Sequence, residues 1–177
     1  VSKFAIEDSK LKITDQNTHQ IGVSTGTTFG SLYSISSFNQ EAMTEGPKFV
    51  NPSVFPSTVG NSASSRVGIK FNIKGFNATL STGMCAALDA LDYACDFIRL
   101  GKAKSVLVGS VEALAIQIFL GFYKLGYLSG FKTGKAVSHP FDQSRDGIVI
   151  SEGSSMLVVE EEASAKGRDA EVYAEIL

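Results

Sequence analysis

The sequence predicts an α/β fold with a mostly parallel sheet flanked by helices. Strand-like and helix-like segments alternate along the chain, and the clearest unit is a long amphipathic helix at 84–100 between two apolar strands at 75–81 and 105–109. A helix that connects two apolar strands is typical of parallel sheets with right-handed crossovers. Of the 177 residues 44% are hydrophobic and 19% are charged, which is the composition of a globular domain.

The first elements surround a strand that ends in a glycine turn. Residues 1–9 are predicted to be the end of a helix followed by a polar link, and residues 20–24 a short strand. The strand runs into a turn at 26–30 that begins and ends with glycine, and residues 32–43 then form a helix.

A loop rich in proline separates this helix from the next one. Residues 46–56 hold three of the four prolines, which predicts an extended loop because proline has a fixed φ and no backbone N–H. Ser57 is a favourable N-cap residue for a following helix that continues to about Phe71. A buried strand is predicted next, at 75–81.

The helix at 84–100 is the most strongly patterned element. It ends at Gly101, and Arg99 and Lys102 lie where basic side chains interact favourably with the helix dipole. Its apolar residues recur at steps of four and three and form one continuous stripe. The stripe consists of Met84, Leu88, Leu91, Cys95 and Ile98.

The last third of the chain is less regular. After the strand at 105–109, a helical region interrupted by glycines extends to about Tyr127, and residues 130–145 form a loop. Strands are predicted at 148–160, with an interruption at Gly153, and at 170–176.

Composition excludes several classes of protein. A net charge of -2 does not favour nucleic acid or an anionic membrane as a partner, and no apolar run reaches the roughly 18 residues that a membrane span needs. Cys85 and Cys95 lie on one predicted helix about 15 Å apart, too far for a disulfide, so a reducing, cytoplasmic setting is expected. No metal-ligand spacing and no phosphate-binding glycine loop occurs, so neither a metal nor a cofactor is expected.

The turn before the long helix is a candidate nucleophile position. A helix N-terminus stabilises a thiolate or an oxyanion through its unpaired N–H groups and the helix dipole. Met84 and Cys85 compete for the position. Helical periodicity predicts that Met84 points along the buried face, whereas Cys85 lies beside Asp89 on a more polar face.

Cys85 has two further interpretations. The segment 83–87 fits a loose Gly-x-Cys-x-small nucleophile elbow of the α/β-hydrolase type, with Cys85 as the nucleophile and His139 as its base. Otherwise Cys85 is simply a small residue at a crowded helix start.

Five motifs follow one another in a characteristic order. The most specific is HPFDQSRDGIVISEG at 139–153, and the others are IGVSTGTTFGS at 21–31, NPSVFPS at 51–57, GFNATLSTGMCAALDAL at 75–91 and VLVGSVE at 106–112. Together they resemble the N-terminal half of a β-ketoacyl synthase (3-oxoacyl-[acyl-carrier-protein] synthase), the condensing enzyme of fatty-acid and polyketide assembly. The resemblance implies one half of a thiolase-like fold, in which helices and sheets alternate in five layers.

The resemblance also implies that residues 1–177 are an N-terminal domain truncated at both ends. The family's catalytic histidines would lie beyond Leu177, so this chain alone is expected to be inactive.

Family spacing assigns the nucleophile position to Met84. In the family, a glycine lies nine residues before the nucleophilic cysteine, another glycine seventeen after it and an acidic residue twenty-eight after it; here these are Gly75, Gly101 and Glu112 counted from Met84. Placing Cys85 there would need two compensating indels. A thioether does not ionise and forms no acyl thioester, so self-acylation is expected to be absent.

The implied function is that of a non-acylating subunit. The segment AALDAL at 86–91 resembles chain-length factors, which lack the cysteine and shape the acyl channel beside an active ketosynthase. The expected partners are acyl carrier protein with acyl and malonyl thioesters, and a second subunit in a homodimer or a heterodimer with an active ketosynthase, through residues near 49–57 and 72–80. The alternative is an active 3-oxoacyl synthase that performs decarboxylative Claisen condensation with Cys85.

Three further sites carry a functional and a structural interpretation. Phe29 matches the floor of the family's acyl pocket, where a ring would shorten the channel, or it is an ordinary core aromatic. Glu112 is either a hydrogen-bonded structural carboxylate or a neighbour of the site. A charged cluster is expected to support a turn through salt bridges rather than to act in catalysis. It consists of Asp142, Arg145, Asp146 and Glu152.

Overall fold

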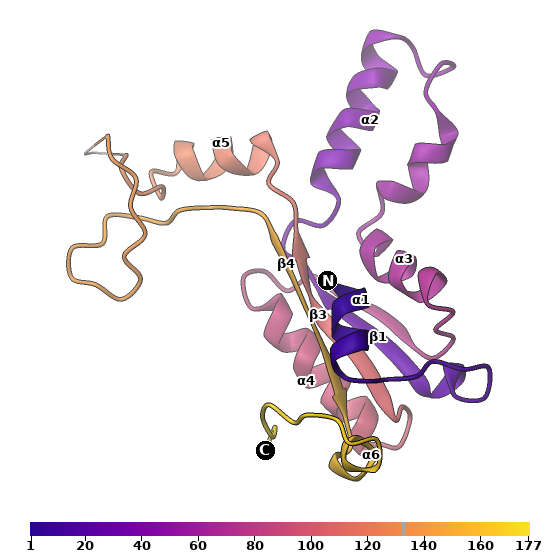
Figure 1. The fold of residues 1–177 in the computed structure, drawn as a ribbon. Helices are drawn as coiled ribbons and strands as arrows, with labels where there is room; N and C mark the ends of the chain where they lie inside the picture. Colours follow the sequence, from indigo (N-terminus) through magenta and orange to yellow (C-terminus); the bar gives the residue numbers. More distant parts are fainter. Residues whose placement is uncertain (132–133) are drawn as a thin grey trace.

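Four strands form one sheet in the order β2-β1-β3-β4 (Figure 1). They are β1 (Ile21–Gly26), β2 (Asn77–Leu80), β3 (Ser105–Glu112) and β4 (Gly153–Glu160). The computed structural model, which describes residues 1–131 and 134–177, pairs β1 in parallel with both β2 and β3 and pairs β4 antiparallel to β3. The mostly parallel sheet is therefore confirmed, with β2 and β4 as its two edges.

Helices cover both faces of this sheet. The long helix α4 (Ala86–Arg99) packs on one face, and α1 (Ser2–Asp8) and α3 (Ser62–Lys70) pack on the other (Figure 1). A short 3₁₀ segment, η1 (Thr18–Gln20), leads into β1, and α6 (Glu162–Gly167) follows β4. The arrangement is the three-layer α/β architecture that the alternating pattern predicts.

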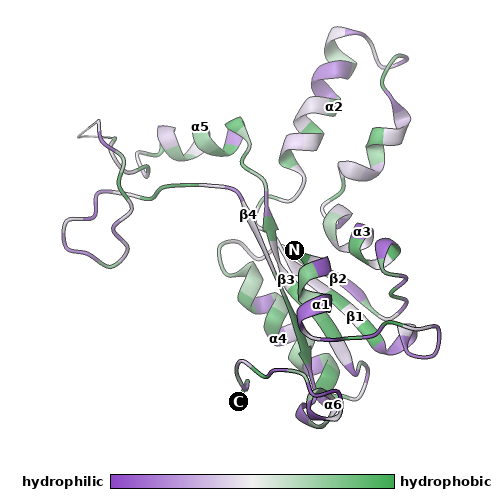
Figure 2. Ribbon diagram, viewed as in Figure 1, coloured by the Kyte–Doolittle hydropathy of each residue, from purple (hydrophilic) through white to green (hydrophobic). Residues whose placement is uncertain are grey.

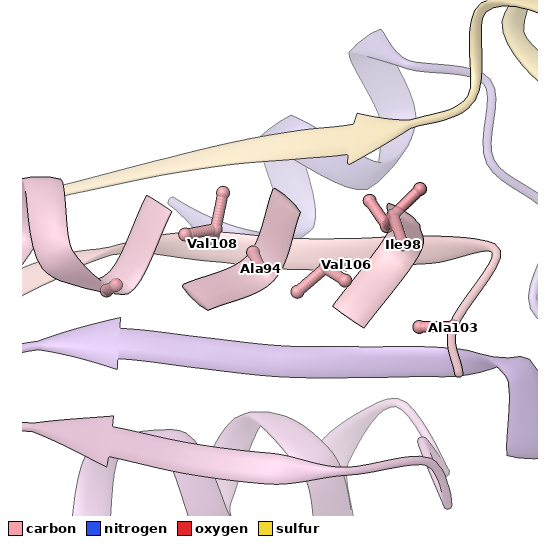
Figure 3. Packing of buried hydrophobic residues seen from close by; sticks show 6 residues of the cluster. Ala94, Ile98, Ala103, Val106 and Val108 are labelled. Atoms are coloured by element: carbon pink, nitrogen blue, oxygen red, sulfur yellow. The ribbon is translucent and has the colours of Figure 1, made fainter. Parts of the chain in front are cut away.

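The core on the α4 side depends on small residues. Figure 3 shows Ala94 and Ile98 of α4 over Val106 and Val108 of β3. Alanine along this face lets the helix approach the sheet closely, and the buried Ser24 hydroxyl of β1 donates a hydrogen bond to the Ala90 carbonyl oxygen at 2.9 Å. All six residues of β1 are buried, as expected for a central strand of a parallel sheet.

Three elements extend away from the sheet: α2 (Leu32–Thr44), the 3₁₀ segment η2 (Pro52–Ser57) and α5 (Ile116–Lys124) (Figure 1). Figure 2 shows hydrophobic residues on α5, whose Ile116, Phe119 and Leu120 are exposed. Exposed apolar side chains grouped on one element mark surfaces that contact other molecules.

The predicted helix from Ser57 to Phe71 is wrong in its first turn. Residues 52–57 form a 3₁₀ segment instead of an extended loop, because the Asn51 side chain accepts a hydrogen bond from the Ser53 amide at 3.0 Å and starts a tight turn. The Ser57 hydroxyl binds the Arg66 guanidinium at 2.5 Å rather than capping a helix. The helix begins later, at Ser62 with Asn61 in the N-cap position.

The C-terminal segment also differs from the prediction. Residues 170–176 form no strand, and α6 was not predicted. An (i, i+4) ion pair between Lys166 and Glu162, at 2.6 Å, favours this short helix. The strand β4 begins at Gly153 rather than at 148, and the described residues of the predicted loop 130–145 contain no helix or strand; residues 132–133 lie outside the described part.

One ion pair joins the end of β4 to the N-terminal segment. The Arg168 guanidinium donates to both oxygens of Glu160, at 2.5 and 2.6 Å, and to the Ser9 carbonyl oxygen at 3.0 Å. The bidentate bonds to Glu160 raise the pKa of Arg168 above its usual value. The residue after α1 and the residue after α6 are thus held together at the end of β4.

Candidate functional site

The candidate site lies where β1 and β2 end beside the start of α4. Gly26, the last residue of β1, pairs with Leu80, the last residue of β2. Because parallel strands end at the same edge of a sheet, the segment after β1 and the segment after β2 lie next to each other. We refer to them as the 27–30 turn and the 81–85 turn. This carboxyl edge is where open α/β sheets bind their ligands.

Glycine and hydrogen bonds shape the 81–85 turn. Gly83 has a φ of +90°, and its carbonyl oxygen accepts a hydrogen bond from the Ala86 amide at 3.1 Å. Cys85 occupies the N-cap position of α4, and its carbonyl oxygen accepts from the Leu88 amide at 2.9 Å. The helix therefore begins at Ala86, two residues later than predicted.

Met84 and Cys85 both lie on this turn with exposed side chains. Met84 is 70% exposed, so the prediction that it points along the buried face of the helix is wrong. Leu88, inside the helix and on the same predicted stripe, is also 67% exposed, so the start of this stripe does not face the sheet. The physical reason is that small alanine side chains take the sheet-facing side at the start of α4, which lets the helix pack closely. The buried face of α4 instead carries Ala86, Ala90, Ala94, Cys95 and Ile98.

The 27–30 turn is held by Glu112, the last residue of β3. One oxygen of this carboxylate accepts from the Thr28 amide at 2.6 Å, and the Phe29 amide donates to the two oxygens at 3.2 and 3.4 Å. The Thr27 hydroxyl is 3.3 Å from the same carboxylate. Glu112 is thus a hydrogen-bonded carboxylate that also borders the site, which combines the two interpretations of the sequence.

Thr28 links the two turns, and sequence reasoning missed it. Its hydroxyl donates to the Gly83 carbonyl oxygen at 3.1 Å, and its own carbonyl oxygen accepts from the Ser81 hydroxyl at 3.2 Å. The available signal was a pair of hydroxyl residues between the two glycines of the 26–30 segment. Threonine side chains in such turns bind nearby backbone groups.

Phe29 belongs to the 27–30 turn, and its side chain contacts α5. Its ring is edge-to-face with Phe122 at a centroid distance of 6.2 Å, and it is 37% exposed. Phe122 in turn contacts Tyr127, with 6.5 Å between the ring centroids. An aromatic cluster therefore borders the site on the side of α5, and Phe122 is a second residue that sequence reasoning did not single out.

The loop after α5 contains the other predicted residues. Ser144 donates to the Asp142 carboxylate from its hydroxyl at 2.6 Å and from its amide at 2.7 Å, and these bonds lower the pKa of Asp142. Asp146 accepts from the Ser129 hydroxyl at 2.6 Å and the Gly130 amide at 3.0 Å. His139 belongs to this loop, where its carbonyl oxygen accepts from the Asp142 amide at 3.2 Å. The contacts are those of a hydrogen-bonded loop support.

The described residues hold neither a cluster of metal ligands nor a candidate membrane span. Among residues 1–131 and 134–177, no three His, Cys, Asp or Glu side chains gather closely enough to hold a metal ion. Within the same part of the chain, no helix has the length and apolar character to cross a membrane.

The two cysteines are expected to differ in reactivity. Cys95 is buried, and desolvation raises the pKa of its thiol, whereas Cys85 is exposed. We expect iodoacetamide at pH 8.5 to label Cys85 about tenfold or more faster than Cys95, because the thiolate is the nucleophile. Peptide mass mapping over time measures both rates. The difference should narrow as the pH rises through the raised pKa of Cys95 and vanish in denaturant; equal rates in the native protein would contradict the burial.

The sequence is similar to that of a known family. The family described as beta-ketoacyl synthase, N-terminal domain, matches residues 1–165. The chain is 32% identical to 3-oxoacyl-[acyl-carrier-protein] synthase 2 of Vibrio cholerae, covering 98% of this chain and 42% of that protein. It is 34% identical to the synthase of the same name from Synechocystis sp., covering 99% and 43%.

Solved structures agree with the sequence matches. One similar chain comes from a type II PKS acyl-carrier protein in complex with its ketosynthase bound to the hexaketide, with a TM-score of 0.85 and 29% identity over 97% of this chain and 44% of that one. Another comes from the ishigamide ketosynthase/chain length factor, with a TM-score of 0.67 and 25% identity over 87% and 38%. The chain spans less than half the length of these relatives. Its fold, its motifs and these matches show that the chain belongs to the β-ketoacyl synthase family and carries that family's N-terminal domain.

Proposed function

We propose that this chain is the N-terminal part of a longer β-ketoacyl synthase subunit of fatty-acid or polyketide biosynthesis that does not acylate itself. The observation that carries the proposal is Met84 in the 81–85 turn, at the position that family spacing assigns to the nucleophile. A thioether has no proton to lose and forms no thioester, so acyl transfer to this position is excluded.

The structure supports the spacing argument at its three reference points. Gly75 lies so close to β1 that an added Cβ would be 2.2 Å from the Ile21 carbonyl oxygen. Gly101 follows α4 with a φ of +66°, and Glu112 is the last residue of β3. Each reference residue thus has a structural reason to keep its place, which supports counting from it to Met84.

We propose the role of a chain-length factor beside an active ketosynthase. In such a complex the partner's cysteine would hold the acyl chain, and loss of CO₂ from a malonyl thioester on acyl carrier protein would supply the carbanion that attacks it. This chain would then shape the acyl channel with Phe29. Phe29 belongs to the 27–30 turn, which is bonded to the 81–85 turn, and its ring lies beside Phe122. A relative's structure contains an acyl-carrier protein with its ketosynthase, and another is a ketosynthase/chain length factor.

We further propose that the protein works as a homodimer or heterodimer. The edge strand β2 has no neighbour on its outer side in the described sheet, and Phe49 and Phe55 are exposed. An open strand edge with apolar side chains nearby favours pairing with a second subunit. Light scattering at micromolar concentration should show a dimer or larger assembly, and a monodisperse monomer would contradict this.

The two free cysteines support a reducing, cytoplasmic setting.

The alternative is an active 3-oxoacyl synthase that uses Cys85. One observation favours it, because Cys85 is an exposed thiol at the N-cap position of α4. In this case the acyl group would be carried on residue 85 rather than being held by a partner subunit.

A labelling experiment separates the two proposals. The full-length protein is incubated with an acyl thioester or with a cerulenin-like epoxide, and its peptides are then analysed by mass spectrometry. We expect no stoichiometric adduct on Cys85 or Cys95, while an active 3-oxoacyl synthase treated in parallel is fully modified. A stoichiometric adduct on Cys85 would overturn the non-acylating proposal in favour of the alternative.

The 177-residue chain alone is expected to form no 3-oxoacyl product from acyl and malonyl thioesters. The proposal places the family's catalytic histidines in the second half, so the isolated domain has only one side of the site. Mass spectrometry of the reaction mixture tests this, with an active full-length synthase as the positive control. Product above the level of a reaction without protein would contradict it.

A further inference from the structure

Glu112 makes an unusually complete set of contacts with one turn. Its carboxylate accepts hydrogen bonds from the Thr28 amide, the Phe29 amide and the Thr27 hydroxyl. The Thr27 hydroxyl also accepts from the Gly30 amide at 3.0 Å, which closes the turn. Consecutive backbone N–H groups that converge on one anion fix the backbone direction between them, and bonds to a charged acceptor are stronger than neutral ones.

The same turn is bonded to the segment that carries Met84. Thr28 donates from its hydroxyl to the Gly83 carbonyl oxygen at 3.1 Å, and Gly83 is the residue before Met84. The path from Glu112 to the 81–85 turn therefore consists of two hydrogen bonds through a single residue. A shift of the carboxylate would move both turns together.

Glu112 also lies close along the chain to the helix that carries Phe122. The strand β3 ends at Glu112, and α5 with Phe122 begins only four residues later at Ile116. Phe29 donates its amide hydrogen to Glu112 and places its ring 6.2 Å from that of Phe122. Glu112 is therefore linked to Phe122 through Phe29.

We propose that Glu112 is a positioning residue that sets the separation between position 84 and the Phe29–Phe122 ring pair. It holds Phe29 directly and the 81–85 turn through Thr28, so the room left for an acyl chain depends on this carboxylate. The inference rests on the proposed function, in which Phe29 limits the acyl channel.

Two variants break the path at different points. Glu112→Gln keeps the size of the side chain and one oxygen for the Thr28 amide, but it puts an NH₂ donor opposite the Phe29 amide. Thr28→Val removes the hydroxyl that donates to the Gly83 carbonyl oxygen. It keeps the backbone amide of residue 28 that donates to Glu112. The matched control is Glu160→Gln, because Glu160 ends β4 and binds Arg168 at the opposite end of the β3–β4 pair.

The first readout is hydrogen exchange of the Thr28 and Phe29 amides in the full-length protein. We expect Glu112→Gln to speed exchange about 10- to 100-fold at these amides. Glu160→Gln should lower thermal stability but leave these two amides unchanged. Unchanged exchange in Glu112→Gln would overturn the inference. If that variant does not fold, Thr28→Val takes its place: the Ala86 amide, which donates to the Gly83 carbonyl oxygen, should exchange faster in it, and unchanged exchange there would overturn the inference.

The second readout is the length of the products formed with an active ketosynthase. Glu112→Gln and Thr28→Val should broaden the product distribution toward longer chains, as Phe29→Ala should, whereas Glu160→Gln should lower the yield without changing the distribution. If Phe29→Ala changes product length but Glu112→Gln and Thr28→Val do not, the inference is overturned and the proposed function stands. If even Phe29→Ala has no effect, the channel role in the proposed function fails, and the inference fails with it.

Discussion

Replacing Met84 by cysteine is expected to create the fastest-reacting thiol in the full-length protein. Met84 is 70% exposed on the turn before α4, so a thiol there is accessible and lies near the positive end of the helix dipole. Such positions lower a thiol pKa from about 8.5 toward 7 or below, which raises the thiolate fraction at pH 7 by about tenfold or more. Labelling with iodoacetamide and peptide mass mapping measure the gain.

Two control variants distinguish the effect of the introduced thiol from the effect of changing the turn or of the native thiol of Cys85. Met84→Ser introduces a group of similar size to cysteine with no thiol, so its labelling should equal that of the unmodified protein. Cys85→Ala should leave the introduced thiol fast and should cost no more than about 1 kcal/mol in stability. If native Cys85 proves faster than the introduced thiol, the nucleophile position belongs to residue 85 and the active-synthase alternative applies.

Gly26→Ala is expected to cause the second large effect, this time on stability. At the end of β1 an added Cβ would lie 2.3 Å from the Ala86 carbonyl oxygen and 2.6 Å from the Ala87 amide nitrogen. Both atoms are backbone atoms of the first turn of α4, so the methyl group forces the helix away from the sheet. We expect the free energy of unfolding to fall by about 1–3 kcal/mol, measured by urea denaturation.

A second glycine provides the matched control for this substitution. An added Cβ at Gly60 would meet nothing within 4 Å, so Gly60→Ala should change stability by no more than about 0.5 kcal/mol. In a Gly26→Ala, Met84→Cys double variant, the displaced start of α4 should also slow the reaction of the introduced thiol with iodoacetamide. A stability equal to that of the unmodified protein would show that β1 and α4 are not packed this closely.

The sequence predicted β1, β2, β3 and the long helix well because those signals are local. The buried β1 and the alternation of strand, helix and strand around α4 follow from apolar runs and from glycines at their ends. The antiparallel direction of β4 was not predicted. A two-residue periodicity is the same for both directions, and the direction here depends on how the chain returns from α5.

The turn that carries Met84 and Cys85 was predicted in its place along the chain, whereas its contacts were not. Met84 and Cys85 were expected on a turn before a helix, and they lie there. The predicted buried orientation of Met84 is wrong, because alanines rather than the larger Met84 and Leu88 take the sheet-facing side at the start of α4. The contacts of Glu112 were not predictable, since the Thr28 amide it binds is 84 positions away along the chain. Hydrogen bonds between distant residues leave no periodic signal in a sequence.

The antiparallel strand β4 has a consequence for biosynthesis on the ribosome. The apolar strand β3 ends at Glu112, and the strand that covers its open edge begins only at Gly153. At elongation rates of about 5–20 residues per second, the nascent chain presents this edge for on the order of 2–8 seconds before its partner is made. An open apolar edge is a template for pairing with other chains. Slow translation of this stretch would therefore lengthen the period in which a nascent chain depends on chaperones.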